Sequence, residues 1–383
     1  MKKFFVAVIV AASLFFASTV NAEVQTYTGE GEYYMSDFET FDTAQQRAKQ
    51  RAEQNACEQA GVFVKSFSRS VNSKLVEDEI TALTSGILNI LNVQYQREHF
   101  DNNTTLIRVT VHVNIDSNDV LKWLNKDDAD RKLLVAQNAE LREKIAEQDR
   151  LIAELKKKFD SASQQVKEQI TREVADADKI FLSKQKVSEA WRLFNQNDFA
   201  GATKIFSEAI ELDPNNSAGY YGRAYAQDGL KNYRQAVEDN TRAIELAPAF
   251  VNAYNNRGEA YRKSENFTAA IQDYNKALEL NPAYVKAYNN RGIVYRKLGN
   301  YAQAFADYDK AIQLNPNYAT AYYNRGYAHM QQKNYSAAID DFTKYIQLAP
   351  NDSDGYDCRG KCYQALGDEA KAQADFTKAS ELN

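Results

Sequence analysis

The pentapeptide "YNNRG" occupies residues 254–258 and recurs unchanged at residues 288–292, 34 residues later. Two variants, "YYNRG" at 322–326 and "YDCRG" at 356–360, continue the same spacing. The five prolines of the chain also follow one another at intervals of 34 residues: Pro214, Pro248, Pro282, Pro316 and Pro350. A fixed period of this length indicates stacked copies of one structural unit.

Residues 183–383 divide into six consecutive repeats, without insertion, when each proline is placed at position 32. Position 8 holds a small residue in every repeat, namely Ala190, Ala224, Gly258, Gly292, Gly326 and Gly360. Position 20 is always alanine, and position 24 is mostly aromatic (Phe206, Tyr274, Tyr308, Phe342 and Phe376). Small residues let two helices approach closely, and the proline stops the second helix. Each repeat is therefore predicted to be a helical hairpin.

These positions resemble the tetratricopeptide repeat family over residues 183–383. The resemblance implies an all-α, right-handed superhelix whose concave groove binds peptides or helices. Three residues depart from the pattern: Gln227 and His329 replace a large apolar residue at position 11, and Tyr345 stands where alanine is expected.

Arginine stands at position 7 in repeats two to six, where this family more often has leucine. Position 23 is aspartate in the same five repeats, whereas repeat one has neither residue and carries Glu189 and Ile205. This joint absence suggests that the two are partners, because a partly buried guanidinium without a carboxylate is costly. We expect a ladder of ion pairs within repeats, the alternative being that each charge faces water. The pairs are Arg223–Asp239, Arg257–Asp273, Arg291–Asp307, Arg325–Asp341 and Arg359–Asp375.

The resemblance also implies that positions 2, 5, 9 and 12 of each first helix face the groove, with a row of amides at position 6. The candidate partner-binding residues are Tyr221, Tyr225, Asn255, Asn256, Glu259, Arg262, Lys286, Asn289, Asn290, Ile293, Arg296, Tyr323, Asn324, Tyr327 and Met330. Amides can hold an extended backbone, and tyrosines offer apolar area with a polar tip. Arg262, Lys263, Arg296 and Lys297 favour an acidic ligand, unless this cluster is simply a solvated face.

Residues 126–182 are predicted to form a coiled-coil helix, since no glycine or proline occurs between Gly86 and Gly201. Apolar residues follow alternating steps of three and four from Leu134 to Val166, with Asn138 at a seam position. We expect homo-oligomerisation through residues 134–166, the alternative being a single helix packed on its own domain. Unbroken from Asn118 to Asn195, such a helix would exceed ~100 Å.

Residues 23–125 are predicted to form a small α+β domain. Four segments alternate apolar and polar residues or are rich in β-formers, and these are the expected strands: 24–35, 62–71, 92–100 and 106–115. Alanines recur every four residues from Ala44 to Ala60, which predicts a helix over 43–61 with a narrow packing face. A second helix is expected over 77–88, and "DNNTT" at 101–105 indicates a hairpin turn.

This domain resembles the amino-terminal domain of flagellar assembly protein T and related small envelope lipoproteins. The matching elements are Gly29, Gly31 and Tyr33, the alanine ladder, residues 72–75, "DEITALTSGI" and the final strand. The resemblance implies a docking module in envelope assembly and transfers no chemistry.

Residues 1–22 have the charge, apolar run and small-residue end of a secretory signal peptide, which predicts a periplasmic or secreted protein without a later transmembrane segment. A membrane anchor is the alternative. Removing Lys2 and Lys3 changes the formal net charge from −5 to −7, and no long basic run remains, so nucleic acid is not an expected partner.

Catalytic motifs are absent from the sequence, and His99, His112 and His329 lack the spacing of metal ligands. No cofactor, metal or enzymatic activity is therefore expected. Cys358 and Cys362 lie four residues apart on one predicted helix, either as two packing residues or as a strained bridge or half of a metal site. The predicted protein is a non-enzymatic scaffold that binds protein segments. Its alternatives are an accessory factor of flagellar or surface-structure assembly and a cell-wall enzyme targeted by the repeats.

Overall fold

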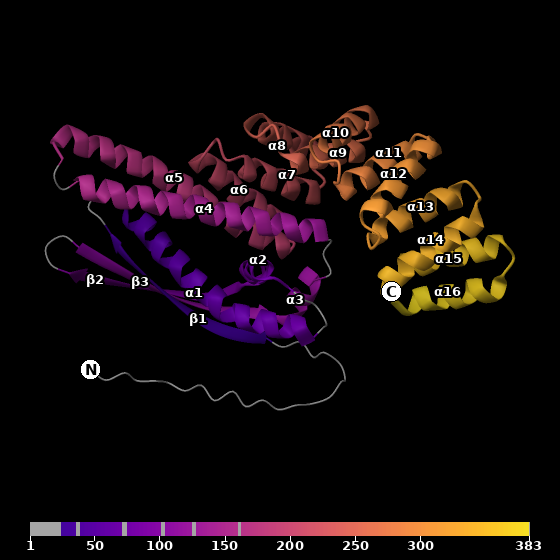
Figure 1. Ribbon diagram of the computed structural model, residues 1–383, viewed down its shortest axis with the longest axis horizontal. Helices are drawn as coiled ribbons and strands as arrows, with labels where there is room; N and C mark the ends of the chain where they lie inside the picture. The colour runs from indigo at the N-terminus through magenta and orange to yellow at the C-terminus, as the bar shows by residue number, and fades with distance from the viewer. Residues whose placement is uncertain are drawn as a thin grey trace, which may run out of the picture.

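The computed structural model describes residues 24–35, 39–70, 75–100, 104–124, 128–159 and 162–382. The predicted signal peptide and residues 72–74 of the resemblance lie outside these ranges. In chain order the described parts are a three-stranded sheet domain, a pair of long helices and an arc of shorter helices, and Figure 1 shows the arc leading away from the other two parts.

The sheet of the amino-terminal domain consists of β1 (Val24–Met35), β2 (Asn89–Phe100) and β3 (Thr104–Asp116). Its strand order is β1-β3-β2, and both neighbouring pairs are antiparallel. Gly29 of β1 and Val93 of β2 both stand opposite Val111 of the central strand. The expected turn at 101–105 falls between β2 and β3, with residues 101–103 outside the described ranges.

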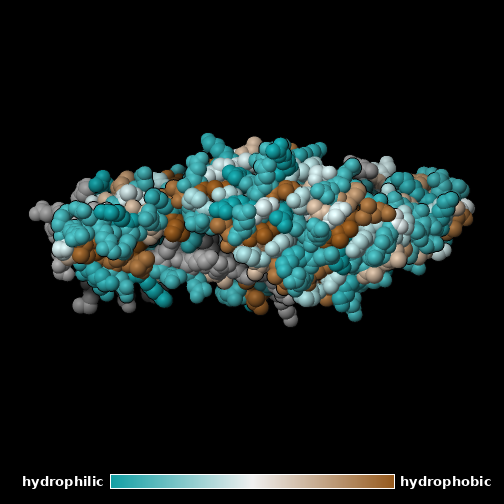
Figure 2. Space-filling model, turned by 90° about the horizontal axis from the view of Figure 1, so that it is seen from above, coloured by the Kyte–Doolittle hydropathy of each residue, from teal (hydrophilic) through white to brown (hydrophobic). Residues whose placement is uncertain are grey.

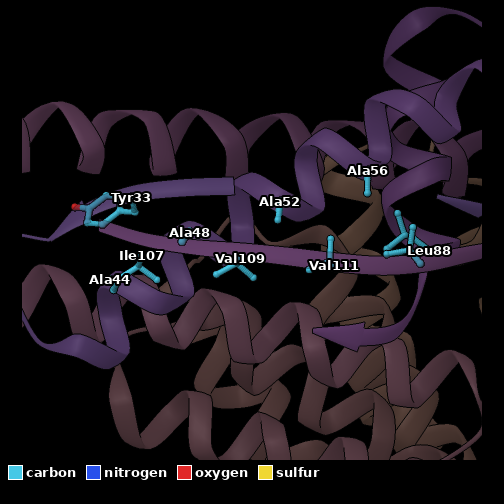
Figure 3. Close-up of a cluster of buried hydrophobic side chains, with 10 residues drawn as sticks. Tyr33, Ala44, Ala48, Ala52, Ala56, Leu88, Ile107, Val109 and Val111 are labelled. Atoms are coloured by element: carbon cyan, nitrogen blue, oxygen red, sulfur yellow. The ribbon is translucent and has the colours of Figure 1, made fainter. Parts of the chain in front are cut away.

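The long helix α1 (Phe41–Ser70) lies on one face of this sheet with its alanines inward. Ala44, Ala48, Ala52, Ala56 and Ala60 are all fully buried, and the first four pack with Val109, Val111 and Val113 of β3 (Figure 3). The glycines of β1 permit this approach, since a Cβ built on Gly29 would lie 2.0 Å from the carbonyl oxygen of Ala52. The predicted alanine face is therefore a contact between a helix and the sheet backbone.

The predicted strand over 62–71 is wrong, because residues 62–70 continue α1. Val64 and Ser68 extend the four-residue step of the alanines, and both side chains are buried. Val64 packs beneath α2 (Glu77–Ile87) and α3 (Ser117–Leu124), in a cluster with Leu83 and Trp123. Tertiary packing thus overrides the strand propensity of "VFVKSF".

Residues 126–182 do not form one extended helix. The structure has two helices, α4 (Asp128–Phe159) and α5 (Gln164–Asn195), which fold back on each other (Figure 1). Leu155 of the predicted seam packs with Phe159 and with Ile170 and Val174 of α5. Val166, the last seam residue, is 43% exposed. The seam side chains at 134, 138, 141 and 145 lie outside the described residues.

A buried arginine joins the hairpin of α4 and α5 to the sheet domain. Arg47 of α1 is 2% exposed and donates to Asp149 of α4 at 2.5 Å and to Asp178 of α5 at 3.2 Å. Its guanidinium also stacks 4.6 Å from the ring centroid of Phe181. Burial raises the pKa of Asp178, although Arg47 acts in the opposite direction. The prediction of one extended helix is wrong, because two helices of the same chain pack on each other at the seam around Leu155.

The arc begins within α5, whose residues from 183 onward form the first helix of repeat one. Its partner is α6 (Phe199–Leu212), and the other five hairpins follow in order. They are α7 (Ser217–Gly229) with α8 (Tyr233–Leu246), α9 (Val251–Lys263) with α10 (Phe267–Leu280), α11 (Val285–Lys297) with α12 (Tyr301–Leu314), α13 (Ala319–Gln331) with α14 (Tyr335–Leu348), and α15 (Ser353–Ala365) with α16 (Glu369–Leu382). The six predicted helical hairpins are therefore present, and the first helix of repeat one is the end of the longer helix α5. None of the helices within the described ranges is both long and apolar enough to cross a membrane.

Candidate functional site

Each arginine at position 7 bonds the aspartate 16 residues later in its own repeat. In repeat four, Arg291 Nε and Nη2 donate to the two carboxylate oxygens of Asp307 at 2.8 and 2.6 Å. The same two-point contact holds for Arg223–Asp239, Arg257–Asp273, Arg325–Asp341 and Arg359–Asp375. All five aspartates are buried. The alternative that both charges face water does not hold.

The third guanidinium nitrogen reaches back to the preceding repeat. Nη1 of Arg291 donates to Asn275 at 2.6 Å, and each of the other four arginines bonds the residue 16 positions earlier. These acceptors occupy position 25 and are Ser207, Thr241, Asn275, Asp309 and Thr343. Sequence reasoning missed them, although a small polar residue at this position in every repeat was a usable signal. Each arginine therefore ties one hairpin internally and to its neighbour.

The amides of the pentapeptide form a second ladder between first helices. Asn290 donates to Asn255 at 3.3 Å, and Asn324 donates to Asn289 at 2.9 Å, each across adjacent repeats. Asn289 also donates to Asn290 at 3.3 Å within α11. Asn255, Asn289 and Asn324 are at most 8% exposed. These residues were predicted to hold a ligand backbone, but the structure shows them bonding to one another.

The remaining residues of the motif also pack. The tyrosine at position 4 lies beside the arginine, with Tyr288 centred 5.6 Å from the guanidinium carbon of Arg291. The glycine at position 8 lies against the aromatic ring at position 24, since a Cβ on Gly292 would come within 2.7 Å of Tyr308. The recurrence of "YNNRG" is thus explained by repeat-to-repeat packing.

First helices of successive repeats contact each other and lie closer together than the second helices do. They therefore form the inner wall of the arc, as the resemblance implied. At its start, Trp191, Phe194, Tyr221 and Tyr225 make a continuous aromatic group, with ring centroids 5.1–6.1 Å apart. We call it the first aromatic patch. Trp191 and Phe194 occupy positions 9 and 12 of repeat one, which the sequence prediction did not include.

A second aromatic patch lies in repeat five. Tyr323 stacks on Tyr327 with 6.4 Å between ring centroids and makes a tilted contact with Tyr345 at 5.1 Å, and Met330 packs in a cluster with Tyr323 and Tyr327. The hydroxyl of Tyr323 lies 3.8 Å from Sγ of Cys358. Cys358 and Cys362 are buried, free thiols rather than a bridge, and burial raises the pKa of both.

Between the two patches the wall is polar, and repeat three carries an internal ion pair. Arg262 donates from Nε and Nη2 to the carboxylate of Glu259 at 2.8 and 2.5 Å, and the hydroxyl of Tyr274 donates to the same carboxylate at 3.2 Å. Burial alone would raise the pKa of Glu259, but Arg262 lowers it below its ordinary value. Lys263 bonds Asp228 at 2.5 Å. Two of the four predicted basic groove residues are therefore already neutralised within the chain.

Repeat four lacks that carboxylate, because Ile293 stands at the position of Glu259. Arg296 donates from Nη1 to the amide oxygen of Gln331 at 3.0 Å and lies 4.8 Å from the ring centroid of Tyr327. Lys286, at position 2 of the same repeat, is partly buried. His329 stacks on Phe305 at 4.3 Å, which agrees with its predicted packing role.

Metal sites are not evident in the described part of the chain, where no group of three or more histidine, cysteine or acidic residues could hold an ion. Hydrophilic residues cover most of the surface seen in Figure 2, and hydrophobic residues emerge between them in small separate groups.

Comparison with known proteins agrees with this geometry. Profiles of the tetratricopeptide repeat match residues 187–249, 258–299, 285–318, 319–352 and 358–383. The second half of the chain is an array of tetratricopeptide repeats. A human protein, small glutamine-rich tetratricopeptide repeat-containing protein beta, is 43% identical over 44 residues, which are 12% of this chain and 14% of that protein.

Solved structures resemble the repeat array in part. A tetratricopeptide repeat protein from Parabacteroides merdae is 24% identical and has a TM-score of 0.45, with 52% of this chain and 80% of that chain covered. The pilus biogenesis factor PilW is also 24% identical, with a TM-score of 0.48 over 50% of this chain and 90% of its own. MamA is 25% identical, with a TM-score of 0.38 over 42% and 94% of the two chains.

Proposed function

We propose that this protein is a non-enzymatic scaffold that binds segments of other proteins along the inner wall of its repeat array. The observation that supports this most directly is the pair of aromatic patches separated by a polar stretch on successive first helices. Aromatic side chains supply contact area at low entropic cost, and they dominate the energetics of protein interfaces. Tetratricopeptide repeats are in general interaction modules rather than enzymes.

The partner segment that suits this wall is extended or helical and carries apolar residues at its two ends, where the aromatic patches lie. The amide ladder is occupied in holding the first helices together, so the wall presents its aromatic and charged groups from a stiff support. Pre-organisation of this kind lowers the entropic cost of binding.

A pull-down with matched variants tests the proposal. Tyr225→Ala combined with Tyr327→Ala removes one ring from each patch, whereas Lys276→Ala combined with Lys310→Ala changes the outer helices α10 and α12. Partners retained by the wild-type chain should be lost with the tyrosine variant and kept with the lysine variant. Equal retention by both variants would contradict binding at the inner wall.

Export and self-association remain proposals that rest on the sequence. Signal cleavage after Ala22 would leave Glu23 as the first residue of the mature protein, which amino-terminal sequencing of protein from the cell envelope would detect. Self-association through residues 134–166 competes with the hairpin contacts of Leu155, and light scattering on the purified chain measures the oligomer directly. A docking role for the sheet domain in envelope assembly rests on its resemblance alone.

A further inference from the structure

Repeats three and four share an arginine at position 12 and a tyrosine at position 24, namely Arg262 with Tyr274 and Arg296 with Tyr308. No other repeat has both residues, since position 12 in the remaining four is Phe194, Asp228, Met330 and Gln364. In repeat three the arginine and the tyrosine meet on one carboxylate, that of Glu259. In repeat four the corresponding residue is Ile293, which cannot accept a hydrogen bond.

The consequence is visible in the hydrogen bonds of repeat four. The hydroxyl of Tyr308 and Nε of Arg296 are both buried, and within the described part of the chain neither makes a hydrogen bond of good geometry, although the two side chains lie within reach of each other. Tyr308 as a whole is 0% exposed. A buried donor without an acceptor costs about 1–3 kcal/mol, so two of them side by side call for an acceptor that both can reach.

The chemistry of that acceptor follows from the neighbouring repeat. Glu259 shows that a carboxylate satisfies an arginine and a tyrosine in these two positions, with two bonds from the guanidinium and one from the hydroxyl. Burial raises the pKa of Tyr308 to about 12, against the lowering effect of nearby Arg296, so the hydroxyl remains a donor near neutral pH. The opposing charge makes bonds from arginine to a carboxylate stronger than bonds to a neutral amide.

We propose that repeat four binds a carboxylate of the partner segment, with Arg296 and Tyr308 taking the roles that Arg262 and Tyr274 take around Glu259. This deepens the proposed function, on which it rests, by naming the chemistry of the ligand: a peptide with an acidic group at this point of the inner wall. Arg296 is held by the neutral amide of exposed Gln331 and by the ring of Tyr327. A carboxylate displaces the amide and turns the guanidinium towards itself.

The specificity of the site follows from the same comparison. Repeat three has the same two donors, but both already bond to Glu259 of the same repeat, so repeat three does not compete for the ligand. The aromatic ring of Tyr327 beside Arg296 joins this site to the second aromatic patch. The preferred segment therefore places an apolar residue near its carboxylate.

The test follows the Nε–H resonance of Arg296 in the full chain by nuclear magnetic resonance, assigned with Arg296→Lys. Sodium acetate is added against sodium chloride at equal ionic strength. Three alanine pentapeptides follow: one capped at both ends with a central glutamate, one capped with a central glutamine, and one with a free carboxyl end. Acetate should shift the resonance, and at least one carboxylate peptide should bind on the order of tenfold more tightly than the glutamine peptide, equivalent to about 1.4 kcal/mol.

A preference for the glutamate peptide assigns the site to an acidic side chain, and a preference for the free carboxyl end assigns it to a chain terminus. Ile293→Glu supplies a carboxylate at the position of Glu259 and should abolish the shift of the Arg296 resonance by acetate. Ile293→Gln adds no charge and should leave that shift in place. Thermal denaturation of both variants shows whether they fold.

An unmoved Arg296 resonance, equal affinity for the three peptides, or an acetate shift that survives in folded Ile293→Glu would overturn the proposal. The carboxylate site can fail while the proposed function holds: if the glutamine peptide binds as well as the others and Tyr225→Ala with Tyr327→Ala removes that binding, the inner wall is a peptide site without a carboxylate requirement. The proposed function itself fails if the tyrosine and lysine variants retain partners equally.

Discussion

Both halves of the molecule bury arginines, but they surround them differently. In the repeat array each arginine bonds the aspartate of its own repeat, as Arg291 bonds Asp307, and only Arg325 of these five adds a second carboxylate, that of Asp309. At the junction of the sheet domain with α4 and α5, Arg47 alone faces Asp149, Asp178 and Glu39. The array is stabilised by many equivalent contacts, whereas the junction concentrates three carboxylates around one guanidinium, with a longer ion pair between Arg192 of α5 and Glu53 of α1 at 3.8 Å beside it.

The two halves also differ in what their closely packed glycines contact. Gly29 lies against the main chain of α1, and a Cβ there would lie 2.0 Å from a carbonyl oxygen. Gly258 in the array faces the ring of Tyr274, at 2.8 Å from the Cβ position. A side chain can turn away, whereas the backbone of a packed helix moves only with the whole helix.

The largest expected effect therefore comes from a substitution at the sheet domain. Gly29→Val should destabilise that domain by more than about 4 kcal/mol, because neither the strand nor α1 can yield. Gly258→Ala should cost about 1 kcal/mol, since the ring shifts and the helix gains propensity. The chain has two tryptophans, Trp123 in the sheet domain and Trp191 in repeat one. Urea unfolding followed by tryptophan fluorescence reports the sheet domain in a Trp191→Phe background and repeat one in a Trp123→Phe background. Equal losses of unfolding free energy from the two glycine substitutions would contradict this contrast.

Substitutions of the buried arginines should give the next largest losses of unfolding free energy. Arg47→Ala leaves carboxylates buried among α1, α4 and α5 and should cost about 3–5 kcal/mol, whereas Arg291→Ala should cost about 1–3 kcal/mol. The double variant Arg291→Ala with Asp307→Ala removes both charges and should recover part of the second loss. Urea denaturation of the three variants measures this order. A larger loss for Arg291→Ala than for Arg47→Ala would contradict it.

The smallest effect concerns pH. Burial raises the pKa of Asp178, so the native state favours the protonated carboxyl. Its stabilising contribution is present below the ordinary pKa of aspartate and is lost as pH rises through the raised value. Asp178→Asn should therefore be somewhat more stable than the wild type near pH 7, and this gain should vanish in acid. A gain that grows on acidification would show the opposite sign of linkage.

Repetition also decides what the sequence could predict. The six hairpins and the partners of Arg223 to Arg359 follow from aligning six repeats, because each position is sampled several times. The inner wall follows from the family resemblance. The role of Asn255 and Asn289 could not be predicted in this way, since a row of amides suits a ligand backbone as well as a neighbouring helix. Only the distance between first helices separates these two uses.

The unrepeated regions gave weaker predictions. The alanine face of α1 was identified from its period, but "VFVKSF" satisfied strand propensity, although Val64 within it continues the buried helical face of Ala60. The heptad pattern around Leu155 was real, and its partner is α5 of the same chain. Periodicity identifies a face that will be buried, and it does not name the element that buries it.

Photocrosslinking in living cells tests most directly whether the inner wall binds other proteins. A benzophenone amino acid placed at Tyr225 or Tyr327 on the inner wall should yield a defined adduct with a partner protein. The same group at Lys276 or Lys310 on the second helices should yield none. Adducts from the outer positions alone, with none from the inner wall, would contradict the account.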